Sequence, residues 1–186
     1  QGFEGRLRRY KYMLTGREFY EGFNKDELID LLMADSRNVV AMDGVWFQSV
    51  EKELGMDAAM HHDEQAWKRY TVTEARRIKK FLGLGENSGL EGLMKALPLR
   101  MVDRANVTSC EMEGDCLNYK VVTCRVQEAR SSKGMPLHPC KSAAVYEYGY
   151  FAKEIDSRIK CECVSCYPDL SEEGKGCACY WRFTIE

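Results

Sequence analysis

The first half of the chain carries apolar residues at helical spacing. Asn24 can act as an N-cap, and Asp26 and Glu27 suit the positive end of a helix dipole. The apolar positions that follow recur about every 3.6 residues, and they are Leu28, Leu32, Val39, Met42, Trp46, Val50 and Leu54. This spacing predicts one long helix that buries the stripe, or two helices broken near Ser36 or Gly44.

Two more helices are predicted in this half. One spans about residues 57–82 and ends at Gly83. Its apolar side consists of Met60, Trp67, Tyr70, Ile78 and Phe81. The next begins at Ser88, which has capping-box spacing to Glu91, and stops at Pro98.

The second half begins with strands. Residues 99–109 and 116–126 are predicted to pair as a hairpin, because Glu113-Gly114-Asp115 between them is typical of a turn. Residues 130–139 contain a glycine and two prolines and are expected to form a loop.

A helix returns over residues 141–158. Its core-facing side is expected to contain Ala144, Tyr148, Phe151, Ala152 and Ile155. Residues 159–166 then have the pattern of a strand, and 167–176 that of a polar turn. The clearest strand is 177–186, in which one face is formed by Cys177, Cys179, Trp181, Phe183 and Ile185.

These elements predict an α+β fold. We expect an N-terminal arm over residues 1–23 and a single domain over 24–186, consistent with a chain of 186 residues. Within that domain, a helical half (24–98) packs on an antiparallel sheet in a cysteine-rich half (99–186), which also holds the long later helix and a cysteine metal site.

Composition and charge narrow the function classes. The chain is 45% hydrophobic and 30% charged, as folded soluble proteins are. A net charge of −2 gives no general attraction to nucleic acid or anionic lipid, so we expect no nucleic-acid and no membrane partner. No apolar run approaches the length of about 18 residues that spans a bilayer, and no signal-peptide pattern opens the chain. The expected location is cytoplasmic.

The nine cysteines all lie between Cys110 and Cys179. In a reducing compartment, thiols gathered in this way are more typical of a metal site than of a disulfide framework. Thiolates from a helix start and two strand ends can close a tetrahedral site, which Zn²⁺ prefers. The sequence therefore predicts a zinc site, with the ligands Cys140, Cys163, Cys166 and Cys179.

Some choices within this metal site stay open. Cys177 and Cys179 lie about 7 Å apart in an extended strand, so one of them is expected to bind, and the same holds for Cys161 and Cys163. Cys177 and Cys124 are substitutes. Four thiolates leave no open position and predict a structural zinc, whereas an iron–sulfur cluster fits the same ligands.

The candidate ligand-binding residues lie in both halves of the chain. Asp43 falls on the apolar side of the first long helix, where a carboxylate needs a partner, and Trp46 and Phe47 beside it can form pocket walls. Arg125 can bind a carboxylate, and Tyr148 can line a cavity. The alternative is that Asp43 pairs with an arginine or caps a neighbouring helix.

Histidines contribute less to this picture. His61 and His62 are adjacent and point to different sides of a helix, so they do not form a two-ligand face and are expected at the surface. His138, two residues before Cys140, is a reserve metal ligand.

Several segments of the chain form a distinctive set: Met42-Asp43-Gly44-Val45-Trp46-Phe47, Glu51, Cys140-Lys141-Ser142, Glu147-Tyr148, Phe151-Ala152, Ile155-Asp156, Arg158-Ile159, Cys163-Val164-Ser165-Cys166-Tyr167-Pro168-Asp169 and Cys179-Tyr180-Trp181-Arg182-Phe183. In these segments the sequence resembles a family of uncharacterised bacterial and archaeal cytosolic proteins, sometimes associated with L-2-amino-thiazoline-4-carboxylate hydrolases. The likeness covers most of the chain from about Asn24, and it implies hydrolysis of a small heterocycle as one activity.

The order of the later cysteines is also remotely similar to the 4-vinyl-reductase-type domain, a small-molecule sensor in some bacterial activators. That pattern has a cysteine at the head of a helix, a ligand pair after it and a last cysteine entering a strand. It also has a glutamate before the later cysteines, a role for which Glu162 and Cys163 compete, so the fourth ligand stays open. This resemblance implies an α+β fold, zinc and a small-molecule pocket.

Three functions follow as expectations. The first is a binding or sensing module for a small organic ligand, lined by Asp43, Trp46, Phe47, Arg125 and Tyr148. The second is a hydrolase, with Asp43 or Glu51 as base or Cys124 as nucleophile. The third is a protein-interaction module marked by an exposed apolar patch. A homodimer stays open in each case.

Overall fold

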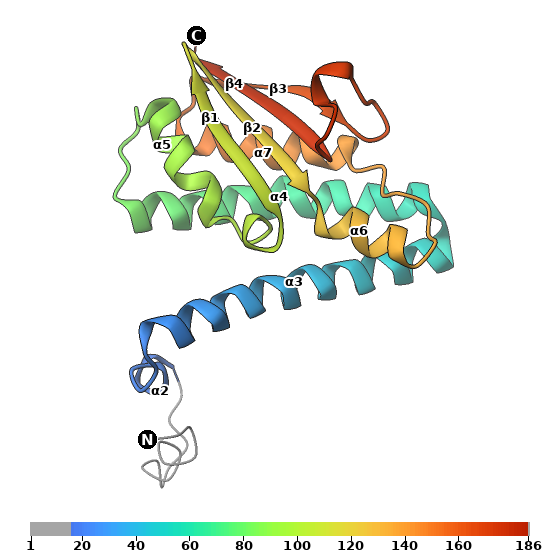
Figure 1. Ribbon diagram of the computed structural model, residues 1–186, viewed down its shortest axis with the longest axis horizontal. Helices are drawn as coiled ribbons and strands as arrows, with labels where there is room; N and C mark the ends of the chain where they lie inside the picture. Colours follow the sequence, from blue (N-terminus) through green and yellow to red (C-terminus); the bar gives the residue numbers. More distant parts are fainter. Residues whose placement is uncertain (1–15, 186) are drawn as a thin grey trace, which may run out of the picture.

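The computed structural model describes residues 16–185. It combines helices with a four-stranded antiparallel sheet, so the predicted α+β fold is confirmed (Figure 1). Residues 1–15 of the expected N-terminal arm lie outside the described part of the chain.

The helical elements alternate with strands only in the second half. The helices are α2 (Arg17–Tyr20), α3 (Lys25–Leu54), α4 (Met56–Leu82), α5 (Gly89–Ala96), α6 (Arg125–Ser132) and α7 (Lys141–Ile155), and the short 3₁₀ turns are η1 (Leu97–Leu99), η2 (Asp103–Ala105) and η3 (Glu172–Gly174). The strands are β1 (Val107–Glu113), β2 (Cys116–Thr123), β3 (Ile159–Cys166) and β4 (Cys179–Ile185), in the order β1-β2-β4-β3. No helix between residues 16 and 185 has both the length and the apolar character that a membrane crossing requires.

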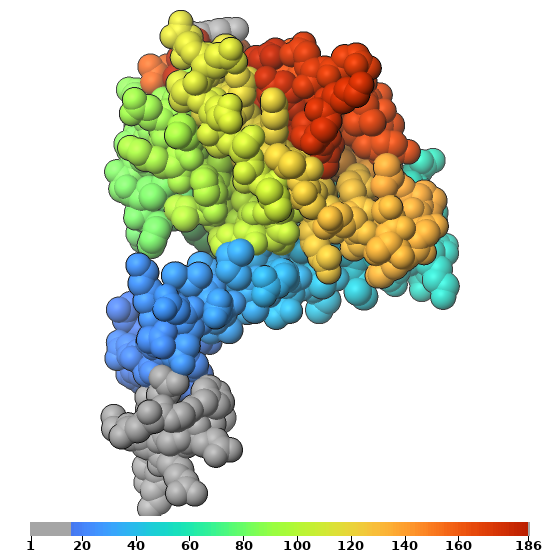
Figure 2. All heavy atoms as spheres, viewed as in Figure 1, coloured from blue at the N-terminus to red at the C-terminus, as the bar shows by residue number. Residues whose placement is uncertain are grey.

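The molecule is layered. The sheet covers α7, α4 packs behind α7, and α3 lies against α4 on the side away from the sheet (Figure 1). The N-terminal end of α3 extends beyond the main body (Figure 2). The short helix α6 follows β2 and lies between the sheet and α3 (Figure 1).

Helix α3 is a single uninterrupted helix of 30 residues. Its start is fixed by a full capping box, since the Asn24 side chain accepts from the Glu27 amide and the Glu27 carboxylate accepts from the Asn24 amide, both at 2.9 Å. Neither Ser36 nor Gly44 breaks it, and Gly55 ends it with a φ of 87°.

The predicted burial of the α3 stripe is wrong. Met42 is 71% exposed, Leu54 64% and Trp46 49%, and Leu28, Leu32 and Val39 are also exposed. The side of α3 that faces the body instead contains Ser36 and Phe47. The same error occurs at the end of α4, where Phe81 is 79% exposed. Helical spacing located these helices but not the side that the body covers.

Three other local predictions are wrong. The strand predicted over 99–109 begins only at Val107, because η1 and η2 occupy the chain before it. Residues 125–132 form α6 rather than the end of a strand and a loop. Ser88 does not cap α5 through its side chain, because its hydroxyl donates to the Gly85 carbonyl. The hairpin itself is confirmed, since β1 and β2 pair around Gly114, which has a φ of 59°.

The main core lies between the sheet and α7. The predicted stripe of α7 is buried along its whole length, with Phe151, Ala152 and Ile155 fully inaccessible. Across the interface, Tyr148 stacks on Trp181 of β4 with ring centroids 4.5 Å apart. This packing places the first turns of α7 directly against the start of β4 and the end of β3, where the cysteines are found.

Candidate ligand cavity and cysteine cluster

A cavity of about 360 Å³ lies between α3, α4, α6 and α7. Its inner wall is mainly apolar and includes Phe47, Trp67, Val121, Ala143 and Tyr148. The volume is at the lower end of the range for small-molecule sites, roughly 300–1,000 Å³. The fold therefore encloses a space suited to a compact organic molecule.

Four of the five predicted ligand-binding residues line this cavity. Asp43, Phe47, Arg125 and Tyr148 do so from α3, α6 and α7, which are far apart in sequence. Trp46 does not, because its ring lies on the other side of α3, 6.3 Å from the His62 ring.

The predicted cysteines meet at one end of the cavity. Cys140 is the residue before α7, Cys163 and Cys166 end β3, and Cys179 begins β4. The Cys140 and Cys166 sulfurs are 3.6 Å apart. The Cys166 thiol is within hydrogen-bonding reach of the thiols of Cys140, Cys163 and Cys179. Three of the four, Cys140, Cys166 and Cys179, line the cavity wall.

A bulge in β3 explains how the Cys163 and Cys166 pair can act together. Side chains three residues apart in a regular strand point to opposite faces. Here Cys163 pairs with Trp181 but Ser165 pairs with Tyr180, so Val164 is an extra residue in the ladder. The extra residue returns Cys166 to the same side as Cys163.

The protonation of these thiols reflects their contacts. A hydrogen bond from Cys166 lowers the pKa of Cys140 to about 5, although burial opposes the change. Cys166 also lowers the pKa of Cys163, and its own pKa is raised because it gives its proton to these neighbours. The cluster thus favours thiolates that share one proton. A bound cation could take the place of that proton.

The separation of the Cys140 and Cys166 sulfurs is compatible with zinc binding. Sulfurs bound tetrahedrally at about 2.3 Å would lie about 3.8 Å from one another, close to the observed separation of Cys140 and Cys166. In residues 16–185, however, no three histidine, cysteine, aspartate or glutamate side chains are already arranged to hold a metal ion.

The substitute ligands lie elsewhere. Cys124 lines the cavity from the start of α6, but burial raises its pKa to about 11. Cys177 donates to the Gly174 carbonyl, and burial raises its pKa as well. Burial likewise raises the pKa of Cys161 to about 12. None of the three is among the thiols that contact Cys166.

His138 lies inside the cavity beside the cysteines. It is 8% exposed, and its Nε2 is 3.6 Å from Oδ2 of Asp63. Gln127 fixes its backbone, since its side-chain amide donates to the His138 carbonyl and accepts from the His138 amide. The imidazole lies close enough to Cys140 to help lower the pKa of that thiol, but no hydrogen bond of normal geometry reaches its Nδ1.

The acidic residues of the cavity differ in their surroundings. Burial raises the pKa of Asp63 to about 6, while His138 opposes the shift. Asp43 has an exposed side chain at the rim. Its carboxylate is still partly desolvated by the surrounding protein, and this raises its pKa. Glu51 is different, because both of its oxygens accept from Arg130 at 2.7 Å, and this lowers its pKa. That ion pair does not favour Glu51 as a base.

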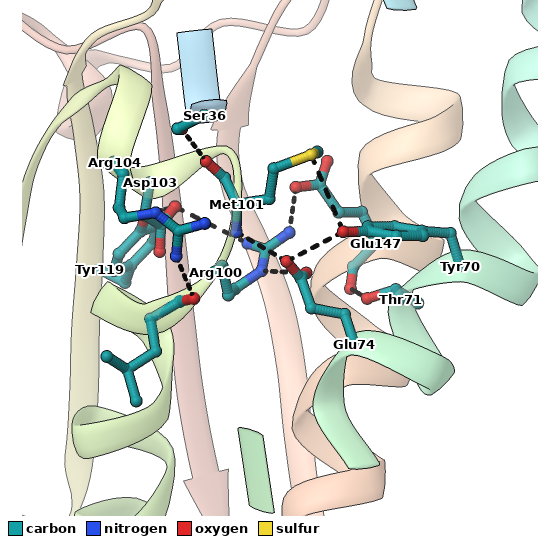
Figure 3. A network of polar contacts seen from close by, with 11 residues as sticks. Ser36, Tyr70, Thr71, Glu74, Arg100, Met101, Asp103, Arg104, Tyr119 and Glu147 are labelled. Atoms are coloured by element: carbon teal, nitrogen blue, oxygen red, sulfur yellow. Dashed lines mark hydrogen bonds and ion pairs between the residues drawn. The ribbon is translucent and has the colours of Figure 1, made fainter. Parts of the chain in front are cut away.

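A network of buried charged and polar side chains surrounds Arg100 (Figure 3). Arg100 is fully buried and contacts Glu74, Asp103 and Glu147, of which Glu147 also lines the cavity. Tyr119 donates to Asp103 at 2.6 Å. Burial raises the pKa of Glu147 to about 7 and that of Asp103 to about 6, against the effect of the guanidinium. Sequence reasoning missed this network, because Arg100 resembles an ordinary surface cation.

The fold and the site define an α+β protein with an internal cavity bordered by clustered thiols. The chain belongs to DUF6125, a family of unknown function, which matches residues 21–185. Neither a curated protein nor a solved structure gave a match.

Proposed function

We propose that this protein binds a small organic molecule in the cavity, beside a zinc ion held by Cys140, Cys163, Cys166 and Cys179, in the reducing cytoplasm. The observation that carries the proposal is the position of the thiol cluster, which is also a wall of the cavity. Four thiolates would fill the coordination sphere, so the zinc is structural.

Such a zinc would join three segments. The start of α7 and the start of β4 each supply one ligand, and the end of β3 supplies two. These segments border the cavity at Cys140, Cys166 and Cys179. The ion would therefore hold the inner end of the cavity in shape, and the helices opposite it would supply ligand contacts.

Metal analysis of the purified protein tests the zinc. We expect one zinc per chain, lost in Cys163→Ser and Cys166→Ser and retained in the matched control Cys116→Ser, whose thiol lies on β2 away from the cluster. Retention in Cys124→Ser and Cys177→Ser would exclude the substitutes. A chain without metal, or with iron and visible absorbance, would overturn the zinc assignment.

A cavity-filling variant tests the ligand. Ala129 lines the cavity from α6, whereas Ala66 is exposed on α4 outside it. In a small-molecule screen by ligand-observed NMR, Ala129→Trp should abolish the binding that wild type shows, and Ala66→Trp should retain it. Binding that survives Ala129→Trp places the ligand elsewhere.

A hydrolase is the second candidate, and one observation favours it. The His138 imidazole lies between the Asp63 carboxylate and the Cys140 thiol. In this case His138 takes the proton of the Cys140 thiol as the sulfur attacks an amide carbon, and it gives that proton to the leaving amine as the C–N bond breaks. Water then cleaves the thioester, which releases a carboxylic acid and restores the thiol. Cys140, rather than Cys124, is the nucleophile in this arrangement.

The two candidates make opposite demands on Cys140, because a sulfur bound to zinc is not a free nucleophile. Alkylation with iodoacetamide, mapped by mass spectrometry before and after chelation, separates them. Protection of Cys140 that disappears with the zinc supports the first candidate. Rapid alkylation of Cys140 in protein as purified supports the second.

A further inference from the structure

We infer that the ligand is a small amphipathic carboxylic acid whose carboxylate lies at the basic rim of the cavity and whose other end forms a hydrogen bond with His138. This inference rests on the proposed binding function. It follows from the distribution of partnered and unpartnered polar groups along the cavity, from its rim to its inner end.

The rim carries three cationic side chains from separate elements. Arg37 comes from α3, Arg125 begins α6 and Lys133 follows α6, and all three are exposed and line the cavity. The structure gives none of these side chains an ion pair or hydrogen bond with residues 16–185. Asp43 is the carboxylate among the exposed rim residues, so the charge at the rim stays positive.

Arg130 provides the contrast within the same wall. It is 3% exposed in its side chain, and both of its terminal nitrogens donate to Glu51. Its charge is already neutralised and serves to hold α6 against α3. The unpaired guanidinium of Arg125 has no such role in the fold and is free to pair with an incoming carboxylate.

The inner end offers a different group. His138 is buried, lines the cavity, and has an Nδ1 without a hydrogen-bond partner. Its Nε2 lies 3.6 Å from the Asp63 carboxylate, so Nδ1 is the ring nitrogen left for a ligand. A hydroxyl or amine group on the ligand would satisfy this buried nitrogen.

Between these ends the walls are apolar, with Phe47 and Trp67 as aromatic surfaces. A ligand that fits therefore has a carboxylate, a compact hydrophobic middle and a distal hydrogen-bonding group. A volume of about 360 Å³ excludes a dinucleotide or an acyl chain carrying a large head group.

Four related compounds test this order of groups by isothermal titration calorimetry. 4-Hydroxyphenylacetate has all three features, 4-hydroxyphenylacetamide and tyramine replace the carboxylate with a neutral and a cationic group, and phenylacetate lacks the distal hydroxyl. We expect 4-hydroxyphenylacetate to bind at least tenfold more tightly than each of the others. Phenyl phosphate tests the alternative anion, and tighter binding of phosphate would overturn the carboxylate assignment.

Rim variants localise the effect. Arg125→Gln should weaken binding of 4-hydroxyphenylacetate about tenfold and leave binding of its amide unchanged, and Arg37→Gln should act in the same direction. Arg77→Gln, an exposed arginine on α4 outside the cavity, should change neither.

NMR of the three histidine rings should show a shift of His138 on binding, with His61 and His62 as internal controls.

The outcomes separate this inference from the proposed function. Equal binding of the acid, the amide and the amine, with no effect of Arg125→Gln, would overturn the carboxylic acid and leave the cavity as a binding site. Binding of the acid without a shift of His138 would overturn the contact with that ring. Failure of every compound to bind would overturn the inference, whereas the small-molecule screen on wild type and Ala129→Trp decides the proposed function separately.

Discussion

Helices α3 and α7 both line the cavity, but they differ in what covers them. In α7 the apolar stripe lies between the sheet and α4, and Phe151, Ala152 and Ile155 are fully inaccessible. In α3 the apolar stripe faces outward, with Met42 71% exposed. Similar spacing along the sequence thus leads to opposite environments.

The difference shows that a helix can join a site without joining the core. Helix α7 fixes the cavity through packing on both sides, whereas α3 contributes a lid of which only Ser36 and Phe47 are buried. No part of residues 16–185 covers the exposed stripe of α3. The following predictions test this contrast, from the largest expected effect to the smallest.

The largest effect is expected from truncating the two stripes. Phe151→Ala should lower the free energy of unfolding by about 3–5 kcal/mol, because it leaves a cavity in a closed core. Met42→Ala should change it by less than about 0.5 kcal/mol. Urea unfolding followed by circular dichroism measures both.

A large effect of Met42→Ala would contradict the contrast and mean that another chain covers α3. Dependence of that effect on protein concentration would identify the covering chain as a second copy. The homodimer left open by the sequence would then follow from the exposed stripe rather than from the cavity.

The second prediction concerns the charge that α7 buries. Arg100 faces three carboxylates, and burial raises the pKa of one of them, Glu147, from 4.5 to about 7 although the guanidinium opposes the shift. Between these values the native protein holds a proton that the unfolded chain has released, so stability falls as pH rises through this window. The loss is on the order of 1–3 kcal/mol.

Urea unfolding at about pH 5 and about pH 8, near the two ends of the Glu147 titration, measures this change of stability with pH. Glu147→Gln should flatten it, because the variant has no proton to lose. Glu86→Gln, an exposed loop residue, should keep the wild-type slope. An unchanged slope in Glu147→Gln would show that other groups cause the pH dependence.

The contrast also explains what the sequence could and could not predict. The α7 stripe and the last strand were predictable, because a regular period in a fully covered element leaves one way to bury it. The meeting of Cys140, Cys166 and Cys179 was predictable as well, since each of these thiols lies at the end or the start of an element, whereas Cys163 joins them through the bulge at Val164. The zinc they are expected to hold stays a prediction.

The rest depended on contacts between distant residues. Periodicity in α3 could not tell which side the body would cover. Helix α6 has almost no apolar period, and its position follows from the buried Arg130 and its pairing with Glu51. The contact of His138 with Asp63 joins a loop to a helix far away in sequence, so no local sequence pattern predicts it.

The third prediction separates the two halves of α3. Glu51, near its end, pairs with the buried Arg130, whereas Arg17 and Glu21 form an exposed pair before its start. Glu51→Gln should cost about 2 kcal/mol, because it leaves a buried guanidinium partly unpaired. Glu21→Gln should cost less than about 0.5 kcal/mol. Equal costs in urea unfolding would mean that Arg130 finds another partner.

The smallest effect is expected at the other end of α3. Asn24→Ala removes the capping box, which contributes about 1 kcal/mol to the first turn. Because this turn extends beyond the body, the loss should stay local (Figure 1). Hydrogen exchange at Glu27 and Leu28 should accelerate about fivefold, while the free energy of global unfolding changes by less than about 0.5 kcal/mol.

Asn38→Ala is the control, because this position is exposed within the same helix, and it should not accelerate exchange at Glu27 and Leu28. A global loss of about 1 kcal/mol or more would mean that the start of α3 is coupled to the core, and that the helix is not the partly detached lid described above.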